Sequence, residues 1–216
     1  MGSEVVIMIQ PNCPSAWKWH SLFVADLINI IRPVSVVELG VHWGFSYLTM
    51  CETVKKLNID CRCYGIDTWL GDNFTGRYGS EVYDFVVREN EKYAAFSQLI
   101  RLPFDAATES FRCGSIDIIH FDGSHDYPSV KNDWHKWSPM LTNRGIALFH
   151  DTQEDGMGVK KMFAELSNSY RHFEFEFCHG LGVLAVGQEL SLPGLFDNHG
   201  QILSSWYGKR AKKIYG

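Results

Sequence analysis

The chain of 216 residues lacks several features that would assign it to a specialised class of protein. No apolar run approaches the length of a membrane span, and the run 5–9 is too short for the core of a signal peptide. The six cysteines include no CxxC pair, so reduced thiols in a cytoplasmic protein are expected rather than a zinc site. With a formal net charge of −5 and no dominant basic face, the chain is not expected to bind nucleic acid.

Apolar segments of strand type and of helix type alternate along the chain. Strands are predicted over residues 34–39, 63–67, 96–102, 115–121 and 145–149, with helical periodicity between them. Phe173, Phe175 and Phe177 then alternate with glutamates, and Gly180 and Gly182 turn the chain into a further strand over 183–186. The predicted fold class is therefore α/β, a doubly wound Rossmann-like sheet that is mostly parallel and ends in an antiparallel hairpin.

One domain is predicted over residues 1–187, with a C-terminal extension over 188–216. The extension lies outside the alternation of strands and helices and carries a cluster of lysine and arginine residues near its end. Two interpretations remain open: a solvated tail or packing arm, and a linker to a further domain.

The turn after the first strand is typical of a small-ligand site. Gly40 and Gly44 follow the strand and precede a helix, where glycine allows backbone to approach a ligand closely. The pattern is not G-x-G-x-x-G, so a ligand without a pyrophosphate is favoured over a dinucleotide. Asp67 ends the next strand, where a carboxylate can accept ribose hydroxyls, while Trp69 and Asp105 are candidates for contacts with an adenine. The alternatives are that the two glycines only form a tight turn, that Asp67 caps the following loop, that Trp69 is a core residue and that Asp105 caps a helix.

These segments resemble the class I S-adenosylmethionine-dependent methyltransferases. The resemblance rests on Glu38-Leu39-Gly40 with Gly44, on Gly65-Ile66-Asp67-Thr68-Trp69 and on the closing hairpin, over residues 34–187. It implies that the amino-acid end of S-adenosyl-L-methionine meets the Gly40 loop, that its ribose meets Asp67, and that Glu38 supports the loop through backbone N–H groups. The most similar branch belongs to bacterial glycan biosynthesis, including lipopolysaccharide, and is related to macrolide-sugar O-methyltransferases and cephalosporin-hydroxylase-like proteins.

The ends of the fourth and fifth predicted strands carry the residues expected to react. His125 is the predicted catalytic base, because an imidazole titrates near neutrality and an alcohol must lose its proton to become a good nucleophile. Asp122, His150 and Asp151 are the candidate ligands for a divalent metal, Mg²⁺ or Mn²⁺. Metal-dependent sugar O-methyltransferases resemble this chain in having Asp-x-x-His, but they place two acidic residues where this chain has His150-Asp151. The alternative is that His150 and Asp151 are strand-end caps and that His125 acts alone.

The predicted function is S-adenosylmethionine-dependent O-methylation of a sugar hydroxyl on a glycan or glycoside, in the cytoplasm. The alternatives are a non-catalytic docking module of a glycan-assembly enzyme and a cephalosporin-hydroxylase-like or N-methylating relative. The expected partners are a small-molecule or glycan acceptor, with no nucleic acid and no membrane span. A longer glycosyltransferase-containing chain and a homo-oligomer are the two assemblies left open.

Overall fold

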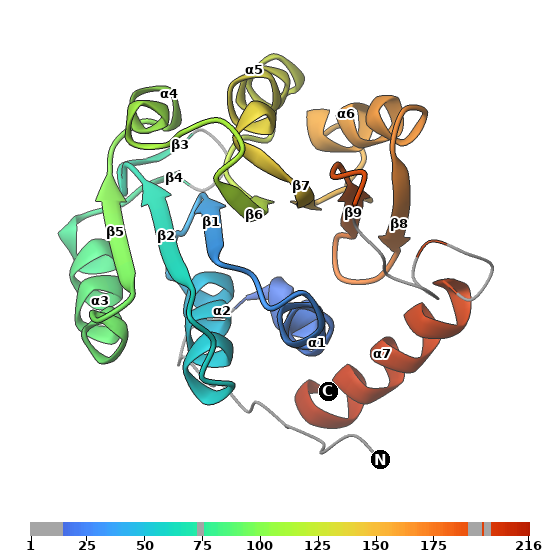
Figure 1. Ribbon diagram of the computed structural model, residues 1–216, viewed down its shortest axis with the longest axis horizontal. Coiled ribbons are helices and arrows are strands. Elements are labelled where there is room, and N and C mark those ends of the chain that lie inside the picture. The colour runs from blue at the N-terminus through green and yellow to red at the C-terminus, as the bar shows by residue number, and fades with distance from the viewer. Residues whose placement is uncertain (1–14, 73–75, 190–195, 197–199) are drawn as a thin grey trace.

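The computed structural model describes residues 15–72, 76–189, 196 and 200–216, and a parallel sheet with an antiparallel edge lies at its centre (Figure 1). The strands of this sheet are β1 (Ser35–Leu39), β2 (Arg62–Asp67), β5 (Ser97–Arg101), β6 (Ile116–Phe121), β7 (Leu141–His150), β8 (Arg171–Phe175) and β9 (Leu181–Ala185). Within the described residues their order is β5-β2-β1-β6-β7-β9-β8. Neighbouring strands in the series β5-β2-β1-β6-β7 pair in parallel, whereas β9 is antiparallel to both β7 and β8. The predicted fold class is confirmed.

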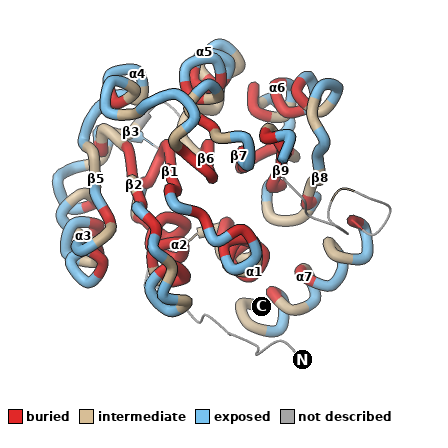
Figure 2. Tube along the Cα trace, in the orientation of Figure 1, coloured by how far each residue is buried: buried red, intermediate tan, exposed pale blue. Residues whose placement is uncertain are grey.

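Helices cover both faces of the sheet (Figure 1). One face carries α1 (Ser21–Ile31), α2 (Phe45–Lys56) and α3 (Ser80–Asn90), and the other carries α4 (Phe104–Ala107), α5 (Tyr127–Trp137) and α6 (Gly158–Ser167). A separate hydrophobic cluster fills the space between the sheet and each layer. Because β1 and β6 are buried on both faces, every residue of these two strands is buried (Figure 2).

The strand β7 is longer than the sequence predicts. It begins at Leu141 rather than at the predicted Gly145. The prediction missed this part of the strand because Thr142, Asn143 and Arg144 are polar and only partly buried or exposed. Such residues read as a loop in a pattern of hydrophobicity, although Leu141 is paired with Ile116 of β6. A two-stranded ribbon of β3 (Gly71–Asp72) and β4 (Gly76–Arg77) was likewise not predicted.

The C-terminal residues include the helix α7 (Gly200–Tyr215), which packs on α1 and on the 3-10 helix η1 (Ala16–His20). The Tyr207 hydroxyl donates to Asp26 Oδ2 at 2.8 Å, and the hydroxyls of Tyr215 and Ser21 are 2.9 Å apart. Residues 1–14 of the predicted domain and 190–195 and 197–199 of the predicted extension lie outside the described residues. None of the described helices combines the length and the apolar character that a membrane span requires.

Candidate active site

A cavity of about 460 Å³ opens at the carboxyl edge of the parallel strands. It is lined by the loop 40–44 after β1, by residues 67–68 after β2, by residues 103–104 after β5 and by the turn 122–126 after β6. Ser15, directly before η1, lies at one side. Open α/β sheets bind ligands at this edge, so the cavity is the candidate active site.

Two glycines shape the loop after β1. Gly40 and Gly44 have positive φ values of 94° and 83°, a conformation that favours glycine. A Cβ atom on Gly40 would lie 2.3 Å from the carbonyl oxygen of Asp122, so glycine lets this loop pack directly on the turn after β6. Gly44 precedes α2, whose first residues Phe45 and Ser46 line the cavity. N–H groups in a first helical turn have no partner within the helix and can hold an anion.

Asp67 holds the loop after β1 in place. Its Oδ2 atom accepts the backbone N–H groups of Val41 and His42, both at 2.9 Å, and its Oδ1 atom accepts that of Trp69 at 2.7 Å. Asp67 also lines the cavity. A carboxylate has about four acceptor positions, so these three bonds leave capacity for a ligand hydroxyl.

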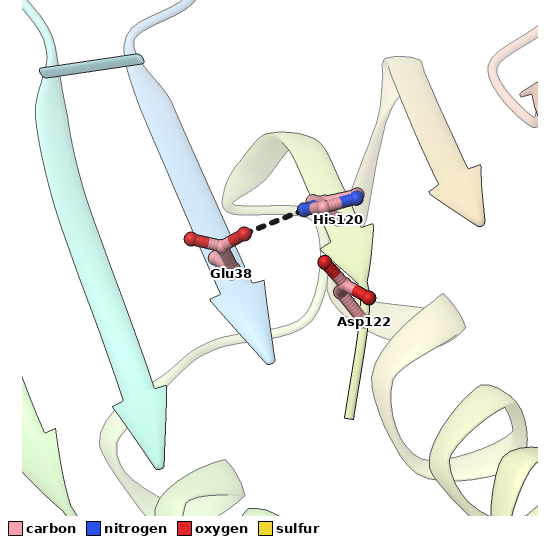
Figure 3. Close-up of side chains that lie close together, drawn as sticks. All are labelled: Glu38, His120 and Asp122. Carbon is pink, nitrogen blue, oxygen red and sulfur yellow. Dashed lines mark hydrogen bonds and ion pairs between the residues drawn. The ribbon is translucent and has the colours of Figure 1, made fainter. Parts of the chain in front are cut away.

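Glu38 lies beneath the loop and outside the cavity. It is fully buried, and its Oε1 atom is 2.7 Å from His120 Nδ1 (Figure 3). Burial raises the pKa of Glu38, and the neighbouring His120 opposes that effect. The expectation that Glu38 supports the Gly40 loop through backbone N–H groups is therefore wrong: Asp67 accepts those groups, and Glu38 pairs with the imidazole of His120.

The hydrogen bonds of His120 determine its tautomer. Trp17 Nε1 is 3.1 Å from His120 Nε2, and an indole N–H only donates, so Nε2 must be the acceptor. A neutral His120 then carries its proton on Nδ1 and donates it to Glu38. Although Glu38, His120 and Asp122 lie close enough together to hold a metal ion (Figure 3), His120 has no free lone pair to offer one.

The four residues predicted to react converge where β6 and β7 end. They are Asp122, His125, His150 and Asp151. His150 Nδ1 lies 3.2 Å from Asp122 Oδ1 and 3.1 Å from Asp151 Oδ1. His125 Nε2 lies 3.3 Å from Asp151 Oδ2. Asp122 and His125 line the cavity, whereas His150 and Asp151 lie behind them. Asp151 has a φ of 63°, which is a strained conformation for a residue with a side chain.

The charges in this cluster stabilise one another. Burial lowers the pKa of His150, but the carboxylates of Asp122 and Asp151 outweigh burial and raise it to about 10. Burial acts in the opposite direction on Asp151, and its bonds to His125 and His150 hold the pKa of this carboxyl well below its usual range. One oxygen or nitrogen from each of Asp122, His150 and Asp151 lies within 4.8 Å of the others, which fits the donor set of a divalent cation.

A protein-family model described as a methyltransferase domain matches residues 37–152, which is more than half of the chain. The chain belongs to this methyltransferase family. The match runs from β1 to the end of β7 and so includes the four segments after β1, β2, β5 and β6 that line the cavity and all four residues of the reacting cluster. The expected membership of a methyltransferase family is thereby confirmed.

The chain is also similar to individual proteins. The uncharacterized protein y4gI of Sinorhizobium fredii is 41% identical over 179 residues, which are 82% of this methyltransferase chain and 20% of that protein. The chain therefore spans about a fifth of the length of this relative. Two solved structures share the fold. The methyltransferase PaMTH1 of Podospora anserina, bound to SAH, has a TM-score of 0.56 at 14% identity and covers 80% of this chain and 88% of that one. The O-methyltransferase TomG of Streptomyces achromogenes, in complex with SAM, has a TM-score of 0.59 at 10% identity and covers 85% and 92%.

Two residues predicted to bind the cofactor of this methyltransferase lie away from the cavity. Trp69 is fully buried, and its Nε1 atom donates to the carbonyl of His42 at 3.0 Å. Its φ of 51° turns the ring toward the core, where it packs 4.8 Å from the ring of Tyr83. Asp105 is directed outward, where it pairs with Lys136 at 3.1 Å and accepts from Asn132 at 2.9 Å. Neither side chain is placed to contact a ligand in the cavity, so these two predictions require correction.

Several residues at or behind the cavity were not predicted from the sequence. Phe104 lies in the wall, and Tyr78, whose ring stacks on that of His42 with the centroids 4.9 Å apart, also lines it. Trp17 and His20 reach the site from η1. Burial and the nearby His150 lower the pKa of His20 to about 3, so its imidazole is neutral. The sequence around Trp17 and His20 contains no signal of these polar contacts.

Proposed function

We propose that this methyltransferase is an S-adenosylmethionine-dependent O-methyltransferase that acts on a sugar hydroxyl. The position of His125 carries the proposal: its side chain lies in the cavity wall beside Asp151, directly after the turn that packs on the loop of Gly40. An acid–base residue is thus held next to the loop that we expect to bind the methyl donor. The relatives that are named as O-methyltransferases or were solved with SAM or SAH support the same reaction class.

The residues of the cavity fit the methyl donor. We expect the carboxylate of its amino-acid end to bind the N–H groups that begin α2, at Phe45 and Ser46. Asp67 retains one acceptor position for a ribose hydroxyl, and Phe104 provides an aromatic surface in the wall. When bound, S-adenosylmethionine supplies a methyl group on a positively charged sulfur, which leaves as a neutral thioether.

His125 is the residue that receives the proton of the acceptor hydroxyl. Asp151 Oδ2 lies 3.3 Å from His125 Nε2 and stabilises the positive charge that protonation places on the ring. The oxygen freed of its proton forms the new bond to the methyl carbon as the carbon–sulfur bond breaks.

Asp122, His150 and Asp151 are the residues that would hold a divalent cation. A cation there would lower the pKa of a bound hydroxyl and orient a second hydroxyl beside it. A vicinal diol of a sugar offers two such hydroxyls. The imidazole among the ligands favours manganese or another transition metal over magnesium.

The acceptor and the setting of the enzyme are also part of the proposal. A sugar acceptor follows from the resemblance to macrolide-sugar O-methyltransferases, as does a role in bacterial glycan synthesis. The much greater length of the Sinorhizobium fredii relative supports an arrangement in which such a domain works within a longer chain. A glycosyltransferase in that chain, a homo-oligomer and a cytoplasmic location stay predictions.

Calorimetric titration with S-adenosylhomocysteine, followed by methyl transfer from tritiated S-adenosylmethionine to glycosides, nucleotide sugars and amines, tests the proposal. We expect binding and a methylated oxygen on a sugar. The variant His125→Asn should keep the wild-type affinity for S-adenosylhomocysteine and lose about 10²–10⁴-fold in kcat, the usual contribution of a general base. His135→Asn, which alters an exposed histidine of α5 outside the cavity, is the matched control.

Two of the alternative functions, the docking module and the N-methylating enzyme, predict different outcomes. Absence of S-adenosylhomocysteine binding would contradict the proposal and favour a docking module. Methylation of nitrogen instead of oxygen would favour the N-methylating relative. Full turnover in His125→Asn would show that His125 is not the base.

A further inference from the structure

One section of the cavity wall has no polar contact in the proposed function. The start of α2 and the carboxylate of Asp67 are assigned to the amino-acid end and the ribose of the methyl donor. Phe104 after β5, with Gly123 and Ser124 after β6, forms a further section of the wall. Since the purine base is the part of the methyl donor that remains, we expect it to lie against this section.

Phe104 and Gly123 give this section an apolar surface. A Cβ atom on Gly123 would lie 2.5 Å from two ring carbons of Phe104, so the ring packs directly on the bare backbone of the turn after β6. An aromatic ring of this kind is a surface on which a purine can stack. Stacking does not distinguish one purine from another, because every base has a π face. Discrimination therefore requires a polar side chain at the edge of the base, and Ser124 is the next residue of the same turn.

The hydroxyl hydrogen of Ser124 is already bound within the protein. Ser124 Oγ donates to Asp133 Oδ2 of α5 at 2.8 Å. Asp133 is buried, and with Ser124 it lines a second cavity of about 10 Å³, which has room for one water molecule at most. Burial raises the pKa of Asp133 to about 6, so above that pH the side chain is a carboxylate, which only accepts. Because a hydroxyl has one hydrogen, Ser124 then offers a ligand only the lone pairs of its oxygen.

We propose that Ser124 determines specificity for the base of the methyl donor by accepting the exocyclic amino group of adenine, and that Asp133 imposes this role by holding the hydroxyl hydrogen. The inference rests on the proposed function, because it names the residue that recognises the base in the same cavity. A base with a carbonyl oxygen in place of the amino group would meet the oxygen of Ser124 with no hydrogen between them, which leaves two polar atoms unpaired. Asp105, the residue expected to meet the adenine, is instead paired with Lys136 outside the cavity.

Calorimetric titration with three ligands tests the proposal without a need for turnover. The ligands are S-adenosylhomocysteine, the analogue with hydrogen in place of the amino group, and S-inosylhomocysteine, which has a carbonyl oxygen there. At about pH 8, where Asp133 is ionised, we expect S-adenosylhomocysteine to bind about tenfold more tightly than the hydrogen analogue, the value of one hydrogen bond. It should bind about 100-fold more tightly than S-inosylhomocysteine, because that ligand leaves polar atoms unpaired. Equal affinities for the three ligands would overturn the proposal.

Two variants assign the preference to the pair. Ser124→Ala should lose about tenfold in affinity for S-adenosylhomocysteine and keep its affinity for the hydrogen analogue, so that the two bind alike. Asp133→Leu removes the buried carboxylate and keeps Ser124, whose hydroxyl is then free to donate; the preference over S-inosylhomocysteine should shrink about tenfold or more. The second variant decides the question if Ser124→Ala does not fold. Ser138→Ala, at the opposite end of α5 from the cavity, is the matched control. Wild-type preferences in Ser124→Ala or in Asp133→Leu would refute the inference.

A rival acceptor and the proposed function can each be told apart from this inference. Asp126 also lines the cavity, where its Oδ1 atom accepts the N–H group of Ser129 at 3.1 Å. If Asp126→Asn lost the preference for the amino group and Ser124→Ala kept it, Asp126 would be the acceptor and the inference would fall. If S-adenosylhomocysteine binds with the expected preferences but no sugar is methylated, the inference stands and the proposed function falls. If sugars are methylated while the preferences are absent, the proposed function stands and Ser124 only packs.

Discussion

Replacing Asp67 with asparagine separates the support of the cavity loop from direct contact with a ligand. The carboxylate accepts the N–H groups of Val41, His42 and Trp69 at 2.7–2.9 Å. The amide oxygen of asparagine can accept the N–H groups of Val41 and His42, as Oδ2 does in Asp67. The amide nitrogen that replaces Oδ1 cannot accept the N–H group of Trp69. The side chain would thus lose its charge and one of its bonds while keeping its shape.

The magnitude follows from these bonds. Hydrogen bonds to a charged group contribute about 1.5–3 kcal/mol each, and neutral ones about 0.5–1.5 kcal/mol, so the change costs about 1 kcal/mol per bond. Since Asp67 is partly exposed and solvent screens its charge, we expect Asp67→Asn to lower the free energy of unfolding by about 2 kcal/mol. The loop would also be less ordered before binding, and the ribose would lose a charged acceptor. Affinity for S-adenosylhomocysteine should then fall about tenfold or more, which corresponds to about 1.4 kcal/mol.

Urea denaturation measures the first quantity and calorimetry the second. Asp60→Asn removes the same charge from an exposed position at the opposite end of β2 and serves as the control. A stability loss with wild-type affinity would restrict Asp67 to the support of the loop. If neither quantity changed, Asp67 would support neither the loop after β1 nor a bound ligand.

Two further predictions concern the proposed metal and a buried carboxyl. Thorough treatment with EDTA should depress turnover, and manganese or magnesium should restore it; unchanged turnover would limit Asp122 and Asp151 to positioning the imidazoles. Burial raises the pKa of Asp133 from 3.8 to about 6, against the opposing hydrogen bond from Ser124. Because the folded protein then binds a proton that the unfolded chain releases, stability should fall as the pH rises from about 4 to about 6. Asp133→Asn should remove that fall and raise the free energy of unfolding at pH 8 by about 2 kcal/mol, measured by urea denaturation at about pH 4 and at pH 8. A fall of equal size in the variant would exclude Asp133 as its source.

The positions of the site residues could be predicted because they depend on strand ends. The apolar runs that form β1 and β6 are each followed at once by a polar turn, and parallel strands bring such turns to one edge. Gly40, Asp67, Asp122 and His125 accordingly all line the cavity. The same reasoning brings His150 and Asp151 to the neighbouring strand end, where the structure has them.

The directions of individual side chains could not be predicted in this way. Trp69 follows β2 as expected, but a left-handed backbone turns its ring into the core. Asp105 lies after β5 but on the outer side of a four-residue helix, facing Lys136. Both outcomes depend on loop dihedral angles, which patterns of hydrophobicity do not encode.

Contacts between distant parts of the chain were also beyond sequence reasoning. Trp17 bonds a residue 103 positions away, and His20 contacts the carbonyl of a residue 158 positions away. A tryptophan and a histidine at helical spacing are compatible with simple core packing. Only the three-dimensional structure shows that their ring nitrogens face other polar groups.

The antiparallel edge of the sheet has a consequence for anyone who wishes to dissect this chain. The family match ends at residue 152, yet β7 is covered along residues 146–150 by β9, which lies beyond that point. A recombinant fragment trimmed to 37–152 would present this long apolar strand as a naked edge, open to pairing with a second molecule. It would also lack η1 and with it the indole that bonds His120. The region of sequence similarity thus contains most of the residues that line the cavity but not all of the structure that holds them in place.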